Sequence, residues 1–181
     1  MPKVDRRIAK SQVAIKNALI ELMSEKSFDD ITIQNISDHA NVSRGTIYLH
    51  YVDKFDLLDK LIEEHINEME EICEATSAAE YADANLPWFE YLENNYLFFS
   101  TMLASKGAPS FRRQFHEFLV EEFKDEVNIS QGKNHELNED VLLQFIVTSY
   151  VGIVEWWITN GMPYPAQVMA EQVGILLERN L

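Results

Sequence analysis

Cysteine, glycine and proline are all scarce in this chain of 181 residues, which holds one cysteine, six glycines and five prolines. A single cysteine, Cys73, excludes an intramolecular disulfide and any cysteine cluster that could hold a metal ion. It also favours a reducing compartment, so we expect a cytoplasmic protein. The few helix-breaking residues and the lack of sustained apolar–polar alternation predict an all-α fold.

Long apolar runs are missing as well. The run from Phe145 to Val154 is interrupted by Thr148, Ser149 and Tyr150 and is too short to span a bilayer. The first ten residues carry charges with no apolar stretch behind them, so we expect no signal peptide. The sequence therefore predicts no membrane partner.

Patterns of catalytic residues are also absent. The sequence has no phosphate-cradling glycine loop, no nucleotide-binding fingerprint and no recognisable pair of nucleophile and base. His116 and His135 each precede a glutamate, but no His-x-x-x-His spacing puts two metal ligands on one helix face. We expect neither a cofactor nor a metal, and the sequence argues against an enzyme.

Acidic residues outnumber basic ones by 30 to 15, which gives a net charge of −15 and at first argues against nucleic acid as a partner. The distribution of charge reverses that conclusion. Residues 1–60 hold nine basic and nine acidic residues, whereas residues 61–181 hold the remaining six and twenty-one. The neutral N-terminal part, with Lys3, Arg6, Arg7, Lys10 and Lys16 near its start, is the only region compatible with DNA.

Apolar periodicity divides the chain into two helical domains. Residues 1–52 form a predicted N-terminal domain of three helices, and residues 53–181 form a predicted C-terminal domain of longer helices. Because the boundary falls within a long helix, no flexible linker separates the two. The predicted helices are residues 6–26, 33–39, 43–50, 53 to beyond 69, 86–105, 109–127, 139–160 and 165–179.

The segment TIQNISDHANVSRGTIYLHYVDKFDLL, which begins at Thr32, carries the functional signal. Thr32 is placed to cap the first short helix, and Ser43 is placed to cap the second. Asn41 lies in the turn between them, where a left-handed backbone is needed and asparagine tolerates it. Two short helices joined by so tight a turn are typical of the unit whose second helix enters the DNA major groove.

The second short helix begins with small or polar residues, as a helix end that approaches base edges must. Gly45 removes bulk beside Arg44, whose guanidinium can donate two hydrogen bonds to a guanine. Tyr48 follows and would place its hydroxyl group near the DNA backbone. Asp53 is expected to cap the next helix, which would place Lys54 and free backbone N–H groups beside a phosphate.

This segment resembles the TetR family of bacterial regulators over residues 6–62. The matching residues agree in order and spacing: Thr32, Ile36, Ala40, Val42, Ser43, Gly45, Thr46, Ile47, Tyr48, His50, Tyr51, Lys54, Leu57 and Leu58. Two positions depart from the usual pattern, because Asn41 replaces the common glycine of the turn and Ser37 replaces a common alanine.

The resemblance implies an all-helical homodimer with a variable C-terminal domain that binds a small effector and dimerises through its last two long helices. It also implies a regulator, most often a repressor, that an effector releases from a palindromic operator. The implied base contacts come from Gln34, Arg44, Gly45 and Thr46. The implied phosphate contacts come from Thr32, Tyr48, His50 and Lys54.

The last two predicted helices carry stripes that predict the dimer interface, since two helix pairs can form a four-helix contact. Gly152 would allow close approach of the backbones. The stripe on residues 139–160 is Val147, Val151, Val154 and Ile158. The stripe on residues 165–179 is Val168, Gln172, Ile175 and Leu176. Two-fold symmetry would then present the recognition helices to successive turns of a palindromic site.

Aromatic residues are dense in the second domain, and a few are expected to line an apolar effector pocket. A solid core is the alternative. The acidic surroundings favour a neutral or cationic ligand over an anion, unless Arg112 or Arg113 turns inward. The candidate lining residues come from four predicted helices: Trp88, Tyr91, Phe99, Phe115, Tyr150 and Trp156.

Simpler interpretations stay open beside these. Tyr48 and Tyr51 can be core aromatics, His50 can be an ordinary surface histidine, and Lys54 can be a solvated helix residue. At the level of function, the chain can be a TetR-like co-activator that acts through a protein partner, or a small helical enzyme. Binding to DNA from upstream of its own gene separates the regulator from both alternatives.

Overall fold

The computed structural model describes residues 6–77, 79–104, 109–127, 129 and 132–181. Within these residues the fold is all-α, as predicted, with helices and two short 3-10 turns and no strand. Lys3, one of the expected basic residues, lies outside the described part. The elements are α1 (Arg6–Glu25), η1 (Phe28–Asp30), α2 (Ile33–His39), α3 (Arg44–Tyr48), α4 (Lys54–Thr76), α5 (Tyr81–Asn94), α6 (Tyr96–Ala104), α7 (Pro109–Phe123), η2 (Gly132–Asn134), α8 (Glu139–Thr159) and α9 (Ala166–Asn180).

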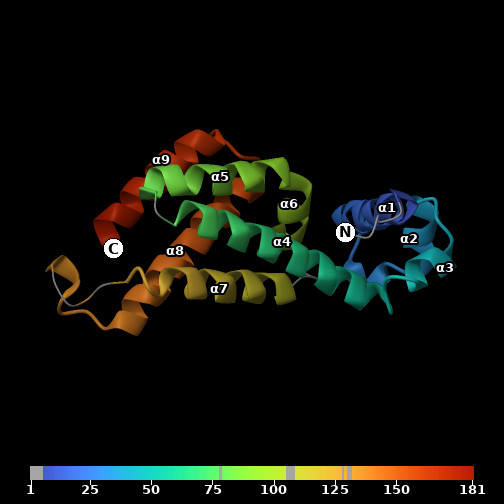
Figure 1. Ribbon diagram of the computed structural model, residues 1–181, viewed down its shortest axis with the longest axis horizontal. Helices are drawn as coiled ribbons and strands as arrows, with labels where there is room; N and C mark the ends of the chain where they lie inside the picture. The colour runs from blue at the N-terminus through green and yellow to red at the C-terminus, as the bar shows by residue number, and fades with distance from the viewer. Residues whose placement is uncertain (1–5, 78, 105–108, 128, 130–131) are drawn as a thin grey trace.

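Helix α4 connects a small N-terminal group of helices to a larger C-terminal one (Figure 1). Helices α1 to α3 gather around the N-terminal end of α4, and α5 to α9 surround its C-terminal half. Leu57, Leu58 and Leu61 of α4 are buried near its start, and Met69 is buried about three turns after Leu57. The expected domain boundary lies at the start of this helix, whose buried side chains contribute to both halves.

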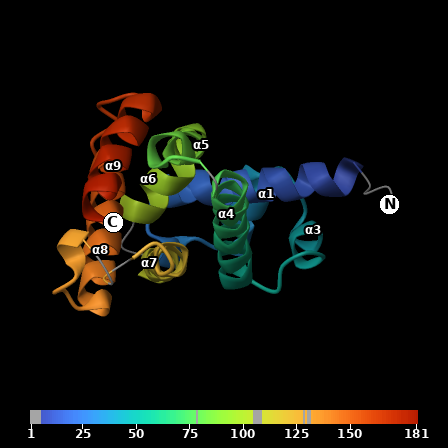
Figure 2. The same ribbon diagram turned by 60° about the vertical axis from the view of Figure 1, so that its left-hand side comes forward.

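The N-terminal group is built around apolar side chains that recur along α1. Ile15 and Leu19 are fully buried, as are Ile36 of α2 and Ile47 of α3. Because α2 and α3 are each too short to be stable alone, this shared core holds them in place. Figure 2 shows α1 lying behind α4 and extending past it, with α3 on the far side.

The predicted helix 86–105 is in fact two helices, which is a correction to the sequence-based assignment. Helix α5 begins at Tyr81, runs through Pro87 and ends before Asn95, where α6 begins at a new angle (Figure 1). Proline lacks the N–H that would continue the backbone ladder. Helix α5 tolerates this loss because Trp88 and Phe89, which follow the proline, are buried in the core.

The predicted interface stripe on α8 is also wrong in its position. Val147, Val154 and Ile158 are fully buried in the core of the protomer itself, so they are not available to a partner. The face of α8 that points outward carries Val141, Phe145, Ser149, Gly152 and Trp156. By length and composition alone, α8 could cross a membrane. Its high apolar content comes from having apolar residues on both faces, and core helices of other proteins pass the same test.

Helices α5 and α9 pack against each other along most of their length, with α9 lying over α5 in Figure 1. Gly174 of α9 makes this possible, because a Cβ atom at that position would come within 2.8 Å of the Ala82 backbone. No side chain is small enough to take its place without moving one helix away from the other.

We predict that Gly174→Ala lowers the free energy of unfolding by about 1–3 kcal/mol, since overpacking forces a backbone shift. Gln167→Ala, at an exposed position of the same helix, should change it by less than about 0.5 kcal/mol. Urea denaturation followed by tryptophan fluorescence measures both. Equal stability of Gly174→Ala and the unsubstituted protein would show that α5 and α9 do not pack this closely.

Candidate nucleic-acid interface

Helix α2 begins at a reciprocal cap. The Thr32 hydroxyl accepts a hydrogen bond from the Asn35 backbone N–H at 3.1 Å, and the Asn35 side chain accepts one from the Thr32 N–H at 3.0 Å. Lys26 donates a further hydrogen bond to the same Asn35 oxygen. These bonds satisfy N–H groups that a helix start leaves free, and they confirm the predicted cap at Thr32.

The turn between α2 and α3 is fixed by two residues that depart from the common family pattern. Asn41 has φ of 52°, which is the left-handed conformation that the sequence predicted. The hydroxyl of the buried Ser37 donates a hydrogen bond to the Val42 carbonyl at 2.7 Å, and the Val42 N–H returns one to the Ser37 carbonyl. An alanine at Ser37 could not make the first of these bonds, so Ser37 fastens the turn.

Helix α3 presents its first residues to solvent while its middle is anchored. Ser43 caps the helix by accepting from the Thr46 N–H at 3.1 Å, and Ile47 is fully buried. Arg44 and Gly45 are exposed. A Cβ at Gly45 would meet only the Ser43 hydroxyl, at an ordinary 3.6 Å, so the protein's own packing does not require glycine there. The open space at Gly45 faces outward.

The other expected contact residues border this surface. Gln34 is exposed on α2, with its amide donating to Asp38 at 2.7 Å. Tyr48 is 57% exposed, so it is not a core aromatic, whereas Tyr51 is buried. His50 is half-buried, with its ring edge against Tyr51.

Lys54 is placed differently from the phosphate contact expected of it. Its ammonium group donates to the carbonyl oxygens of Phe28, Asp29 and Ile31 at 2.8, 3.0 and 2.8 Å, and lies 4.8 Å from the centre of the Phe28 ring. An ammonium has three N–H donors, and all three are used here. Lys54 thus fastens the start of α4 to η1.

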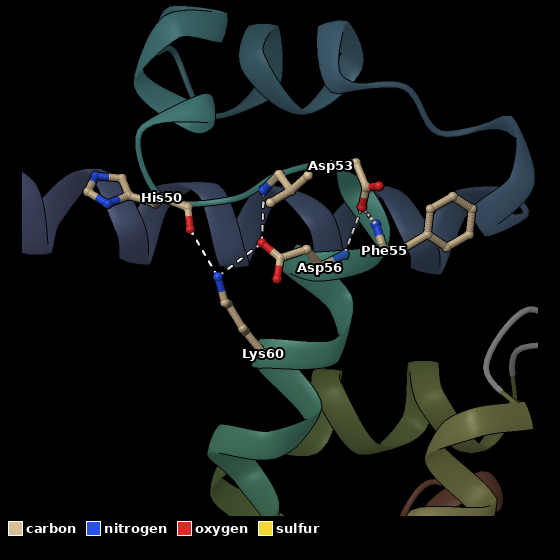
Figure 3. Close-up of polar contacts among 6 residues, drawn as sticks. His50, Asp53, Phe55, Asp56 and Lys60 are labelled. Atoms are coloured by element: carbon tan, nitrogen blue, oxygen red, sulfur yellow. Dashed lines mark hydrogen bonds and ion pairs between the residues drawn. The ribbon is translucent and has the colours of Figure 1, made fainter.

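The start of α4 is further closed by carboxylates. The Asp53 carboxylate accepts hydrogen bonds from the N–H groups of Phe55 and Asp56, both at 2.9 Å (Figure 3). These N–H groups were expected to be free for a phosphate, and they are occupied instead. Asp56 in turn accepts from the Val52 N–H and from Lys60, contacts that lower the pKa of its carboxyl. Lys60 also donates to the His50 carbonyl at 3.2 Å, which ties the residues that follow α3 to α4.

The six aromatic residues predicted to line an effector pocket do not meet in one place. Phe99 and Phe115 are fully buried in a solid aromatic core, and Trp156 is 46% exposed on the surface. Tyr91 faces the junction with α4, where its hydroxyl lies 2.5 Å from the His65 ring nitrogen. Only Trp88 and Tyr150 line a cavity, whose volume is about 560 Å³.

This cavity lies among α4, α5, α7, α8 and α9, and most of its lining escaped the sequence analysis. The lining residues not predicted include Tyr81 and Asn85 of α5 and Glu122 and Phe123 of α7. Tyr81, Asn85 and Trp88 follow at spacings of four and three, which is one face of a helix. That spacing could have indicated a shared lining face, but the predicted helix begins at residue 86 and so leaves out Tyr81 and Asn85.

We predict that Lys54→Met, which keeps the aliphatic stem, lowers the free energy of unfolding by about 2 kcal/mol because three carbonyl oxygens lose a charged donor. Lys60→Met, which removes more exposed contacts, should cost less than about 1 kcal/mol. Urea denaturation compares the two. If Lys54→Met instead kept full stability and lowered the salt dependence of DNA binding by about one unit, Lys54 would be a phosphate contact after all.

Comparison with known proteins agrees with this architecture. A family model described as "Bacterial regulatory proteins, tetR family" matches residues 15–61, and one described as "Transcriptional regulator C-terminal region" matches residues 79–179. An uncharacterized HTH-type transcriptional regulator, YxbF of Bacillus subtilis (strain 168), is 22% identical over 178 residues. The match covers 93% of this chain and 45% of that relative, so the chain spans about half its length.

Two solved structures show the same fold. A TetR transcriptional regulator from Streptococcus agalactiae 2603V is 26% identical with a TM-score of 0.72, and the match covers 96% of each chain. The dihydroxyacetone kinase operon activator DhaS is 16% identical with a TM-score of 0.59, and the match covers 93% of this chain and 94% of that one. The chain therefore belongs to the TetR family of bacterial regulatory proteins.

Proposed function

We propose that the chain is a homodimeric repressor that binds a palindromic operator through α3 and is released by a small molecule bound in its C-terminal domain. The observation that carries this proposal is the exposed start of α3. Arg44 and the open space at Gly45 are presented by a turn that Ser37, Asn41 and Ser43 hold fixed. Because the proposed partner is DNA, we also expect the protein in the cytoplasm.

Sequence would be read by the exposed residues at the start of α3 and beside it. Arg44 has the geometry to donate two hydrogen bonds to one guanine, and Gly45 lets the helix approach the base edges. Thr46 and Gln34 complete the base contacts. Thr32, Tyr48 and His50 flank this surface and would contact phosphates, which position the protein without specifying sequence. We assign Lys54 to the support of this surface, because its donors are occupied.

The dimer would form through the outward faces of α8 and α9. Phe145 and Trp156 of α8 are 59% and 46% exposed, and Ile175 and Leu176 of α9 are 39% and 46% exposed. Phe145 and Leu176 border a shared groove of about 230 Å³ between the two helices. Burial of these residues against a second copy would remove the largest apolar surface that the two helices expose.

Helix α4 would transmit effector binding to the DNA-binding domain. Its 23 residues span about 35 Å, with Thr76 at the cavity and Lys54 beside the recognition segment. At the domain junction, the His65 ring of α4 stacks on Phe98 of α6 with ring centres 3.7 Å apart. Burial lowers the pKa of His65 to about 4, so it is a neutral packing group at neutral pH. A ligand that prefers one tilt of α4 shifts the equilibrium by its differential affinity.

A co-activator that acts through a protein partner is the second candidate. The acidic C-terminal domain supports it, as does the likeness of the fold to DhaS, which is named as an operon activator. The two candidates differ in what binds DNA. A repressor shifts its own operator in a gel without a second protein, whereas a co-activator shifts it only when its partner is added.

We predict that Arg44→Ala weakens binding to the operator by about 1–3 kcal/mol more than binding to random DNA, because a guanine contact discriminates between sequences. Tyr48→Phe, as the matched change to a proposed phosphate contact, should weaken both by a similar factor. Fluorescence anisotropy on an operator selected from random DNA gives the two affinities. Equal losses for Arg44→Ala on both DNAs would make Arg44 a phosphate contact.

We also predict that Phe145→Glu and Ile175→Glu, made together, convert a dimer to a monomer at micromolar concentration, since two charges would be buried in an apolar contact. Leu97→Glu, at a position of α6 that is 46% exposed, is the control and should leave the dimer intact. Light scattering measures the mass. A monomeric unsubstituted protein would refute the interface and, with it, the palindromic operator.

A further inference from the structure

The cavity among α4, α5, α7, α8 and α9 has an aromatic wall. Tyr81, Trp88, Phe123 and Tyr150 contribute rings from three different helices. Leu119 and Leu177 add aliphatic surface on the α7 and α9 sides. At about 560 Å³ the cavity lies within the size range of sites for small organic molecules.

The floor of the cavity is polar and already ordered. The Tyr150 hydroxyl donates to the Asn85 side-chain oxygen at 2.7 Å, and the Asn85 amide donates to the Tyr81 carbonyl at 2.6 Å. Both Asn85 and Tyr150 are more than nine-tenths buried. The remaining lone pairs of these oxygens are acceptors, so the floor suits a ligand that donates hydrogen bonds or carries positive charge.

Carboxylates line the same cavity without a basic partner. Glu80, Glu122, Glu126 and Glu178 border it, and no lysine or arginine is among the described residues of its lining. Glu126 accepts a hydrogen bond from the Tyr81 hydroxyl at 2.9 Å, so one carboxylate is joined to the aromatic wall. Burial and the nearby carboxylates of Glu70 and Glu74 raise the pKa of Glu122, while a hydrogen bond with the Cys73 thiol lowers it.

The basic residues that could have favoured an anion are engaged elsewhere. Arg112 donates to Glu155 and to the Leu103 carbonyl, and Arg113 pairs with Glu117 on the outer face of α7. Cys73 lines the cavity beside Glu122, but its thiol is not a reactive nucleophile there. Burial raises the pKa of its thiol to about 12, so it stays protonated and is a poor nucleophile.

We propose that this cavity is a binding site for an organic cation that carries an aromatic or other bulky apolar group. The positive charge would lie among Glu122, Glu126 and Glu178, and the apolar part would lie against Trp88 and Tyr150. Aromatic faces attract a cation directly, so wall and rim favour the same ligand. The inference deepens the proposed function, on which it rests for the regulatory meaning of the site, by naming the class of effector.

The test uses two pairs of probes that match in shape and differ in charge. The larger pair is tetraphenylphosphonium and tetraphenylborate, and the smaller pair is benzyltrimethylammonium and benzylsulfonate. Isothermal calorimetry on the 181-residue protein should give at least one cation that binds about tenfold more tightly than its matching anion. Trp88 fluorescence, read in a Trp156→Phe, Trp157→Phe background, should change only with the cation.

Two glutamates of the same helix locate the site. Glu122→Gln should weaken binding of the cation at least threefold and, because it removes a half-buried charge that has no basic partner among the described residues of the lining, should not lower the melting temperature. Glu117→Gln, outside the cavity, should leave the affinity unchanged. Anions that bind as tightly as cations, no binding by either cation, or equal affinities of the two variants would each overturn the proposal.

A gel-shift with the same cation separates this inference from the proposed function. Release of the operator by the cation, weakened by Glu122→Gln, supports both. Binding of the cation at Glu122 without release of DNA leaves the cation site standing and contradicts the effector-controlled repressor. Release of DNA by a neutral or anionic compound that does not depend on Glu122 supports the repressor and overturns the cation site.

Discussion

Helix α4 runs without a break from the N-terminal group of helices to the cavity of the C-terminal group. One unbroken helix begins beside the recognition segment, provides Leu57 and Leu61 to the N-terminal core, and ends with Cys73 and Thr76 at the cavity. At its midpoint Lys16 of α1 pairs with Glu64, and so joins α1 to the same helix. A helix transmits tilt because its backbone hydrogen bonds resist bending. Movement of one half can therefore reach the other through α4.

The surface that we propose faces DNA is held in shape by hydrogen bonds within the protein. Thr32 and Ser43 cap α2 and α3, Ser37 fastens the turn between them, and Lys54 fastens α4 to the carbonyl oxygens of η1. These contacts leave the start of α3 exposed yet ordered. A rigid surface loses little conformational entropy on binding, which favours recognition by few residues. The same logic explains why a lysine in a DNA-binding motif can act as an internal clamp.

Local chemistry made much of the fold and site predictable from the sequence. The caps at Thr32, Ser43 and Asp53 and the left-handed Asn41 follow from short-range rules, and the structure confirms them. What failed depended on tertiary contacts. The inward face of α8 could not be told from the outward one because both are apolar, and α5 continues through Pro87 only because Trp88 and Phe89 are buried. The use of Lys54 depended on carbonyls 23 to 26 residues away in sequence.

Pulsed electron paramagnetic resonance can test whether α4 couples the cavity to the spacing of the two α3 helices in the proposed dimer. The variant carries Cys73→Ala, which removes the native thiol, and Asp30→Cys, which attaches a spin label at an exposed position of each protomer. The distance between the two labels reports that spacing. On operator DNA we expect one narrow distance distribution, since successive major grooves lie about 34–36 Å apart. Saturating tetraphenylphosphonium should move the distribution to a different mean. An identical distribution with and without the bound cation would contradict the coupling.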